Sequence, residues 1–312
     1  MKRKLTLWGV FAVLGLSLVA WCYPRTFHEP SHRAIELPNR IGAWLEAKES
    51  AVAGLREGVK KEVLWAGSPE TITELSIAYL HGFSASRREI SPVVESIAKR
   101  LHANAFMTRL HGHGSTGEML AKASAEDWIE DAREAIAVAR AIGKKVVLIG
   151  TSMGAILSLF AAFENPDLEA VVLISPIFAP KDPRAMWLLS PGGQWLAELV
   201  NGPIRKWTPT NLLQVQGWTT EYPVMAVVPV MQLVKRAQSF PLEQLRPKVL
   251  GFYTPLDGTV DSDLILKKFD EIGSSKKQLL RFDDAQEHVL VGDAMNPKAN
   301  ERVVEAVIDF LK

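Results

Sequence analysis

The sequence has little cysteine and almost no net charge. A single cysteine among 312 residues excludes an intramolecular disulfide, so the folded chain depends on its own apolar core for stability. A net charge of +1 gives no reason to expect a nucleic-acid partner. Hydrophobic residues make up 47 % of the chain, as is usual for globular proteins. The length suits one large α/β domain with an insertion, or two smaller domains.

Charged residues are absent from positions 5–23, which form an apolar run long enough for one membrane span or a signal-peptide core. Three basic residues precede this run, and no small-residue cleavage site follows it. We therefore expect residues 1–24 to be an uncleaved signal anchor in a bacterial-type cell envelope, with the body exported from the inner membrane to the periplasm or beyond. A lipoprotein site at Cys22 is an alternative, although the bulky Trp21 precedes it. A cleaved signal peptide, which would make the protein secreted, is another.

Strand and helix patterns alternate through most of the remaining chain. Residues 25–58 are predicted to form a connector with an amphipathic helix at about 38–52, and residues 59–312 a single domain. The expected strands cover 61–66, 72–80, 105–110, 146–150, 170–175, 249–253 and 278–282. Such alternation predicts a mostly parallel sheet with helices on both faces and a ligand site at the carboxyl ends of the strands. The stretch at about 177–246 interrupts it and predicts an inserted cap of short helices.

The run from Val146 to Ala155 predicts a nucleophilic serine. An apolar strand breaks into Gly150-Thr151-Ser152-Met153-Gly154, and a helix of small residues follows. In such a strand-to-helix turn, the serine takes a strained conformation that exposes its hydroxyl, and the flanking glycines remove Cβ atoms that would collide. The Met153 N–H would then lie at a helix N-terminus, where it can stabilise an oxyanion.

A serine hydroxyl needs a base, and the base needs an acid that orients it. In hydrolases with this turn the order along the chain is serine, acid, histidine. His288 is the only histidine after Ser152 and is therefore the predicted base. Asp257 directly follows a predicted strand and is the predicted acid, with Asp261 as its rival. Asp257 could instead be a turn residue that caps the next helix.

The sequence His81-Gly82-Phe83 follows another apolar strand. The glycine permits a tight backbone path, so the Phe83 N–H is the predicted second oxyanion donor. We expect His81 to hold this loop by hydrogen bonds. His111 and His113 have a spacing that permits metal binding, but no third ligand stands at a recognisable distance, so neither a metal nor a cofactor is predicted.

Together these motifs resemble the α/β-hydrolase superfamily; they are His81-Gly82-Phe83, Gly112-His113-Gly114, Gly150-Thr151-Ser152-Met153-Gly154, Asp257 and His288. The run 111–114, with 126–131 further on, is similar to the microbial carboxylesterase and monoacylglycerol-lipase-like branch. The resemblance covers about 60–312. It implies Ser152 as nucleophile, His288 as base and Asp257 as acid, with main-chain amides forming the oxyanion hole. Residues 25–58 lie outside the usual pattern of the family.

The predicted function is hydrolysis of short- to medium-chain acyl esters or monoacylglycerols through an acyl-enzyme on Ser152. The chain-length expectation comes from the tryptophans of the cap and from the apolar stripe at 186–189, which would alternatively be the core of the cap itself. A thioesterase, amidase, peptidase or perhydrolase would use the same triad. A membrane-tethered, non-catalytic binding protein on a hydrolase scaffold is the alternative from another class. The oligomeric state is not predicted.

Overall fold

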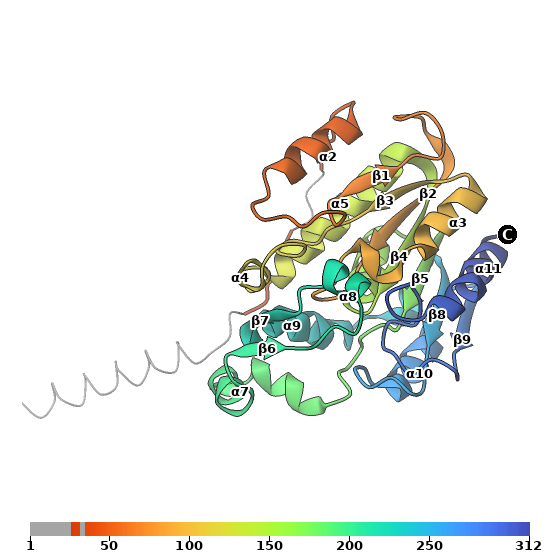
Figure 1. Ribbon diagram of the computed structural model, residues 1–312. Coiled ribbons are helices and arrows are strands. Elements are labelled where there is room, and N and C mark those ends of the chain that lie inside the picture. Colours follow the sequence, from red (N-terminus) through yellow and green to blue (C-terminus); the bar gives the residue numbers. More distant parts are fainter. Residues whose placement is uncertain (1–25, 32–34) are drawn as a thin grey trace, which may run out of the picture.

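The computed structural model describes residues 26–31 and 35–312 (Figure 1). The predicted signal anchor and the alternative lipidation site at Cys22 lie outside these residues. Within them, no helix combines the length and the apolar character needed to cross a membrane.

A seven-stranded sheet forms the centre of the described chain, in the order β1-β3-β2-β4-β5-β8-β9. Its strands are β1 (Glu62–Leu64), β2 (Thr73–Leu80), β3 (Asn104–Met107), β4 (Gly143–Thr151), β5 (Ala170–Ile174), β8 (Lys248–Tyr253) and β9 (Lys277–Arg281). All neighbours are parallel except β1, which runs antiparallel to β3. The first two strands, β1 and β2, are therefore not neighbours in the sheet, because β3 lies between them.

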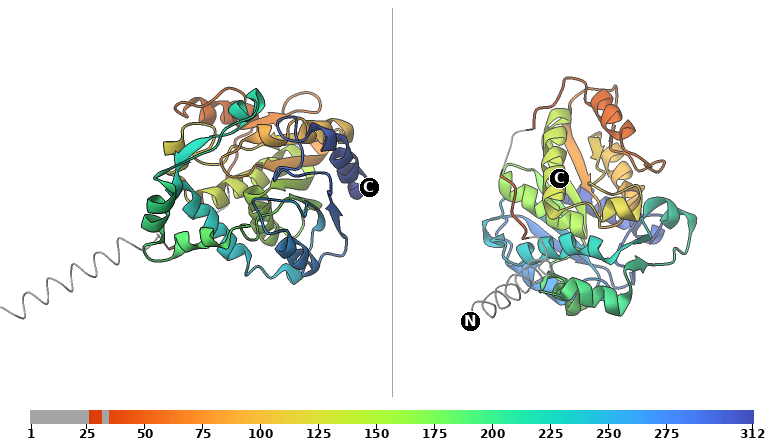
Figure 2. Two further views of the ribbon diagram at one scale, coloured as in Figure 1. Left: turned by 60° about the horizontal axis from the view of Figure 1, so that its bottom comes forward. Right: turned by 90° about the vertical axis from the view of Figure 1, so that its left-hand side faces the viewer.

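Helices cover both faces of this sheet (Figure 2). The α-helices are α2 (Ile41–Ser50), α3 (Val93–Leu101), α4 (Gly117–Leu120), α5 (Ala125–Ile142), α6 (Met153–Glu164), α7 (Gly193–Asn201), α8 (Leu212–Gly217), α9 (Val228–Ala237), α10 (Ser262–Asp270) and α11 (Asn300–Leu311). Short 3-10 segments are η1 (Arg87–Ile90), η2 (Pro183–Leu189), η3 (Val224–Val227), η4 (Leu242–Gln244) and η5 (Pro297–Ala299).

The central strand β4 separates two apolar cores. Val146 and Leu148 belong to the core that contains residues of α5, α6 and α9. Val147 and Ile149 belong to the core that contains residues of α3 and α11. This alternation arises because successive side chains of a strand point to opposite faces. A strand buried on both faces must be apolar throughout, which is why the run is uninterrupted by polar residues.

The inserted stretch contains the predicted short helices together with an antiparallel pair of strands that the sequence did not suggest. This pair joins β6 (Ile204–Lys206) to β7 (Glu221–Pro223). The last helix of the stretch, α9, packs against α5 and α6 and so helps to cover one face of the sheet. Helix α2 lies beside β1 at the opposite end of the sheet from β9 (Figure 1).

Candidate active site

Ser152 lies between the end of β4 and the start of α6. Its backbone has φ 55° and ψ −112°, a conformation that non-glycine residues rarely adopt. The two glycines of the motif are required by close contacts. A Cβ atom on Gly150 would lie 2.4 Å from the carbonyl oxygen of Gly154, and one on Gly154 would lie 1.9 Å from the carbonyl oxygen of Leu80. The motif therefore forms the sharp, crowded turn that its residues predict.

The structure brings Ser152 together with His288 and Asp257, each of which follows a different strand. Ser152 Oγ lies 2.8 Å from His288 Nε2. His288 Nδ1 lies 2.8 Å from Asp257 Oδ2. With Nδ1 donating to the carboxylate, Nε2 is left as an acceptor for the serine hydroxyl, which is the arrangement a general base requires.

Asp257 and Asp261, the two carboxylates considered for the acid, have different roles in the structure. Asp257 is 3 % exposed, and its second oxygen accepts hydrogen bonds from the amides of Thr259 and Val260 at 2.7 and 3.0 Å. Burial opposes its ionisation, but the hydrogen bond to His288, the charge of His288 and these amides together hold the pKa of Asp257 below its usual value. Asp261 instead caps α10, where it accepts from two backbone amides.

The loop after β2 lies against Ser152, since a Cβ atom on Gly82 would be 3.5 Å from Ser152 Cβ. The amides on both sides of Phe83 are bound by buried side chains. Gly82 N–H donates to Glu89 Oε1 at 2.6 Å, and Ser84 N–H donates to His113 Nε2 at 3.1 Å. Within the described chain the Phe83 N–H has no backbone or side-chain acceptor, which leaves it free to donate a hydrogen bond to a substrate oxygen. We call residues 81–84 the oxyanion loop.

Met153, the other predicted donor, is the first residue of α6 and is fully buried. The first amides of a helix have no partner within it and carry the positive end of the helix dipole. The Met153 N–H therefore meets the requirement for an oxyanion donor beside the nucleophile.

Two fully buried imidazoles hold the oxyanion loop in place, as predicted for His81. His81 Nδ1 donates to the carbonyl oxygen of Gly82 at 2.9 Å, and its Nε2 accepts from Leu110 N–H at 3.0 Å. His113 Nδ1 donates to the carbonyl oxygen of His111 at 3.0 Å. Burial lowers the pKa of His81 to about 4 and that of His113 well below its usual value, so both rings are neutral. No group of three metal-ligating side chains occurs in the part of the chain that the structure describes.

Sequence reasoning missed Glu89, which lies in η1 beneath the oxyanion loop. This carboxyl group is 1 % exposed and accepts from Tyr79 Oη at 2.5 Å as well as from Gly82 N–H. Burial raises its pKa from the ordinary 4.5 to about 8. No pattern would have identified it, because it stands next to Arg87 and Arg88 in a charged run of the kind that usually faces solvent.

The tryptophans of the inserted stretch do not form one surface. Trp218 is buried and meets Trp207 edge to face, with ring centroids 6.3 Å apart. Trp187 and Trp195 are 56 % and 65 % exposed. Within the apolar stripe at 186–189, Leu188 is buried in the core shared with α6. Part of that stripe therefore packs into the protein itself.

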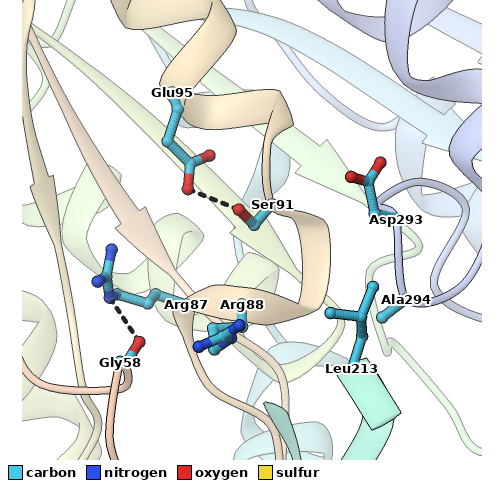
Figure 3. Close-up of a pocket in the computed structure, with 8 residues that line it drawn as sticks. All are labelled: Gly58, Arg87, Arg88, Ser91, Glu95, Leu213, Asp293 and Ala294. Carbon is cyan, nitrogen blue, oxygen red and sulfur yellow. Dashed lines mark hydrogen bonds between the residues drawn. The ribbon is translucent and has the colours of Figure 1, made fainter. Parts of the chain in front are cut away.

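A surface pocket is lined by none of the three triad residues; Figure 3 shows its lining. Its lining residues are Gly58, Arg87, Arg88, Ser91, Glu95, Leu213, Asp293 and Ala294. The polar groups pair mainly with the protein, since Arg87 Nε donates to the carbonyl oxygen of Gly58 at 3.1 Å and Ser91 Oγ donates to Glu95 at 2.8 Å. We assign it no part in the reaction.

Comparison with known proteins identifies the family of this chain. The family described as serine aminopeptidase, S33, matches residues 73–239, which is more than half of the chain. The chain belongs to the serine aminopeptidase S33 family. The matched residues include the oxyanion loop and Ser152, and they exclude α2, Asp257 and His288.

Relatives of this S33 family member include lipolytic enzymes. It is 24 % identical to the thermostable monoacylglycerol lipase of Bacillus sp. (strain H-257), over 74 % of this chain and 89 % of that protein. Among solved structures, a metagenome-derived lipolytic enzyme superposes with a TM-score of 0.64 at 18 % identity, covering 82 % of this chain and 98 % of that one. The monoacylglycerol lipase of Paleococcus ferrophilus gives 0.62 at 18 % identity, over 80 % and 97 %. The predicted α/β-hydrolase fold and the predicted enzyme class, a lipase- and esterase-like hydrolase, are thus confirmed.

Proposed function

We propose that this S33 family member hydrolyses short- to medium-chain acyl esters or monoacylglycerols through an acyl-enzyme on Ser152. The observation that carries the proposal is the pair of 2.8 Å contacts that link Ser152 Oγ to His288 Nε2 and His288 Nδ1 to Asp257 Oδ2. The monoacylglycerol lipase activity named for the Bacillus relative supports the ester class.

In the proposed first step, Ser152 Oγ attacks the ester carbonyl carbon while His288 Nε2 takes the hydroxyl proton. The carbonyl oxygen becomes an oxyanion and accepts hydrogen bonds from the amides of Phe83 and Met153. When the tetrahedral intermediate collapses, the C–O bond to the alcohol breaks and His288 gives its proton to the leaving oxygen. Asp257 stabilises the imidazolium throughout and does not itself take the proton.

In the second step, water attacks the acyl-enzyme while His288 again accepts a proton. The same amides stabilise the second oxyanion, and the proton returns to Ser152 Oγ as the carboxylic acid leaves. The reaction needs only groups that the chain supplies, together with one water molecule.

The experiment is a substrate panel on the full-length chain, beside the variant Ser152→Ala. p-Nitrophenyl esters from acetate to palmitate and monoacylglycerols are assayed for turnover, and circular dichroism checks that both proteins fold. We expect an optimum among short to medium acyl chains and a loss of turnover by roughly a million-fold in the variant. A folded wild type that cleaves no ester would rule the proposal out.

A second candidate, amide hydrolysis, is favoured by the description of the family as a serine aminopeptidase. The same triad would attack an amide carbonyl, with the amine leaving in place of the alcohol. Aminoacyl p-nitroanilides in the same panel separate the two. A kcat/KM higher for anilides than for every ester would make the protein a peptidase. If the folded protein does not react with a fluorophosphonate, only the alternative of a non-catalytic binding protein on a hydrolase scaffold remains.

We also propose that residues 1–24 anchor the protein in the inner membrane with the body exported. The uncharged run at 5–23 behind three basic residues supports this arrangement. Protease treatment of spheroplasts tests it. A body that is digested only after the membrane is opened would contradict the proposed orientation, and a chain released by carbonate washing would contradict the anchor.

A further inference from the structure

Helix α2 lies outside the residues that match the S33 family, yet one of its charged side chains is buried deep in the protein. Glu49, in the last turn of α2, is 3 % exposed. Its carboxylate accepts hydrogen bonds from Arg109 Nε at 2.7 Å, from Arg109 Nη2 at 2.8 Å and from the backbone amide of Lys61 at 2.8 Å. A bidentate pair of this kind fixes orientation as well as distance.

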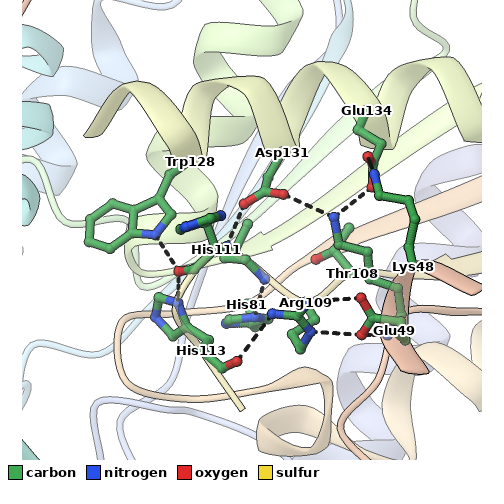
Figure 4. Close-up of polar contacts among 12 residues, drawn as sticks. Lys48, Glu49, His81, Thr108, Arg109, His111, His113, Trp128, Asp131 and Glu134 are labelled. Atoms are coloured by element: carbon green, nitrogen blue, oxygen red, sulfur yellow. Dashed lines mark hydrogen bonds and ion pairs between the residues drawn. The ribbon is translucent and has the colours of Figure 1, made fainter. Parts of the chain in front are cut away.

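Arg109 carries the connection from α2 toward the oxyanion loop (Figure 4). It follows β3, is 8 % exposed, and donates from Nη1 to the carbonyl oxygen of His113 at 3.3 Å. The planar guanidinium group thus contacts the carboxylate of Glu49 and the backbone of His113 at once. A lysine ammonium has no such fork of donors.

His113 completes the path to the oxyanion loop. Its backbone is held by Arg109, and its ring accepts the amide of Ser84, the residue directly after Phe83. The ring also lies edge to face against His81, with centroids 4.9 Å apart. The chain of contacts therefore runs from Glu49 through Arg109 and His113 to the loop that presents the Phe83 N–H.

A second set of contacts ties the same region to α5. Lys61 Nζ donates to Asp131 Oδ1 at 2.9 Å and to Glu134 Oε1 at 2.6 Å. The other oxygen of Asp131 accepts from the backbone amide of His111 (Figure 4). Burial alone would lower the pKa of Lys61, but the two carboxylates outweigh it and raise that pKa, so the ammonium group stays charged. The 109–113 segment is thus held from α2 and from α5.

We infer that Glu49 and Arg109 are positioning residues for the oxyanion loop, so that the connector helix α2 supports the catalytic site through Glu49. This inference rests on the proposed function, because it concerns the same oxyanion hole. It explains why a segment outside the family match carries a buried carboxylate. Loosening this support displaces the Phe83 N–H from the site where negative charge develops, which lowers kcat more than it alters substrate binding.

The first variant is Glu49→Gln in the full-length chain, with Glu46→Gln as its matched control. Glu46 lies on the same helix and loses the same charge, but it pairs with Lys60 at an exposed site where its side chain is 64 % accessible. Loss of a whole oxyanion donor lowers kcat by roughly 100-fold or more, so displacement of one donor should lower it by roughly 10-fold. We expect that loss for Glu49→Gln with KM within about twofold of the wild type, and no change for Glu46→Gln.

Two further measurements separate positioning from simple stabilisation of the fold. A trifluoromethyl ketone forms a tetrahedral adduct whose oxygen occupies the oxyanion hole, so its affinity should fall by the same factor as kcat. All rates are measured at a temperature where circular dichroism shows each variant folded. If Glu49→Gln does not fold, Arg109→Lys replaces it, because this change keeps the charge and removes the planar group that contacts Glu49 and His113 at once.

The rate of labelling by a fluorophosphonate distinguishes this inference from the esterase proposal, because labelling needs Ser152 and the oxyanion hole but no ester turnover. A wild type that labels yet cleaves no ester would reject the esterase proposal, and slower labelling of Glu49→Gln would still support the positioning role. A folded variant with wild-type kcat, analogue affinity and labelling rate would overturn the inference. A wild type that neither labels nor turns over would overturn both.

Discussion

The carboxyl group of Glu89 offers a quantitative test of the polar interior beside the oxyanion loop. It is 1 % exposed, and Tyr79 Oη and the amide of Gly82 both donate to its Oε1. Burial disfavours the charged form strongly enough to raise the pKa from 4.5 to about 8, although these two donors partly oppose the effect. The perturbation is Glu89→Gln, which keeps an oxygen acceptor for both donors and cannot ionise.

The sign of the pH dependence follows from the number of protons that the folded and the unfolded protein bind at Glu89. Between pH 4.5 and about 8 the folded protein keeps the Glu89 proton, whereas the unfolded chain has lost it. The contribution of this group to stability is fully present below pH 4.5 and is lost as the pH rises through about 8. At about 1.4 kcal/mol per pH unit, the interval corresponds to about 5 kcal/mol in the free energy of unfolding. The variant lacks this dependence.

The assay is urea unfolding of the wild type and of Glu89→Gln at pH 5.5, 6.5 and 7.5. We expect the difference in the free energy of unfolding, variant minus wild type, to increase by about 1.4 kcal/mol for each unit by which the pH is raised. Glu74→Gln removes an exposed carboxylate on the same strand as Tyr79 and controls for the change in net charge. Two parallel curves for wild type and Glu89→Gln would refute the reasoning, because they would mean that Glu89 is ionised in the folded protein.

Three further predictions concern the triad and its surroundings. Asp257→Asn should lower kcat by roughly 1,000-fold or more, measured by steady-state kinetics on the best ester, because His288 Nδ1 loses its carboxylate partner; a loss below tenfold would contradict that role. Asp261→Ala should leave kcat unchanged and lower the free energy of unfolding in urea by about 1 kcal/mol, because it removes only a helix cap. Gly154→Ala should lower the free energy of unfolding by about 3 kcal/mol or more, because its Cβ would lie 1.9 Å from a carbonyl oxygen. Gly258→Ala, with no atom within 4 Å of the added Cβ, is the control for thermal unfolding of this variant.

Much of the fold could be predicted because its signals are local. The centre of β4, Val146–Ile149, is apolar throughout and leads into Gly150, and both features follow from burial on two faces and from a sharp turn. The predicted strand at 249–253 agrees with β8 to within one residue. The pairing of strands is less local, so the antiparallel joining of β1 to β3 and of β6 to β7 was not predicted. Their register depends on partners far apart in the sequence.

The residues of the candidate site also differ in whether the sequence alone could identify them. The turn around Ser152 and the position of His288 follow from motif and order along the chain. The choice between Asp257 and Asp261 does not, because both carboxylates follow the same strand at a distance of a few residues and only the path of the loop brings one of them to His288. The contact between Ser152 and His288, 136 residues apart, exists only because parallel strands end at the same edge of the sheet.

The sequence by itself determined which segments form the main strands, where the turn at Ser152 lies and which histidine is the candidate base, because each depends on neighbouring residues or on chain order. Only the tertiary structure decided that Glu89 is buried against the oxyanion loop and that Glu49 is buried against Arg109. Both glutamates stand among charged residues in the sequence, where solvent exposure is the usual outcome. Whether a carboxylate is buried depends on the elements that pack over it, and here the partners that compensate for its burial come from other parts of the chain.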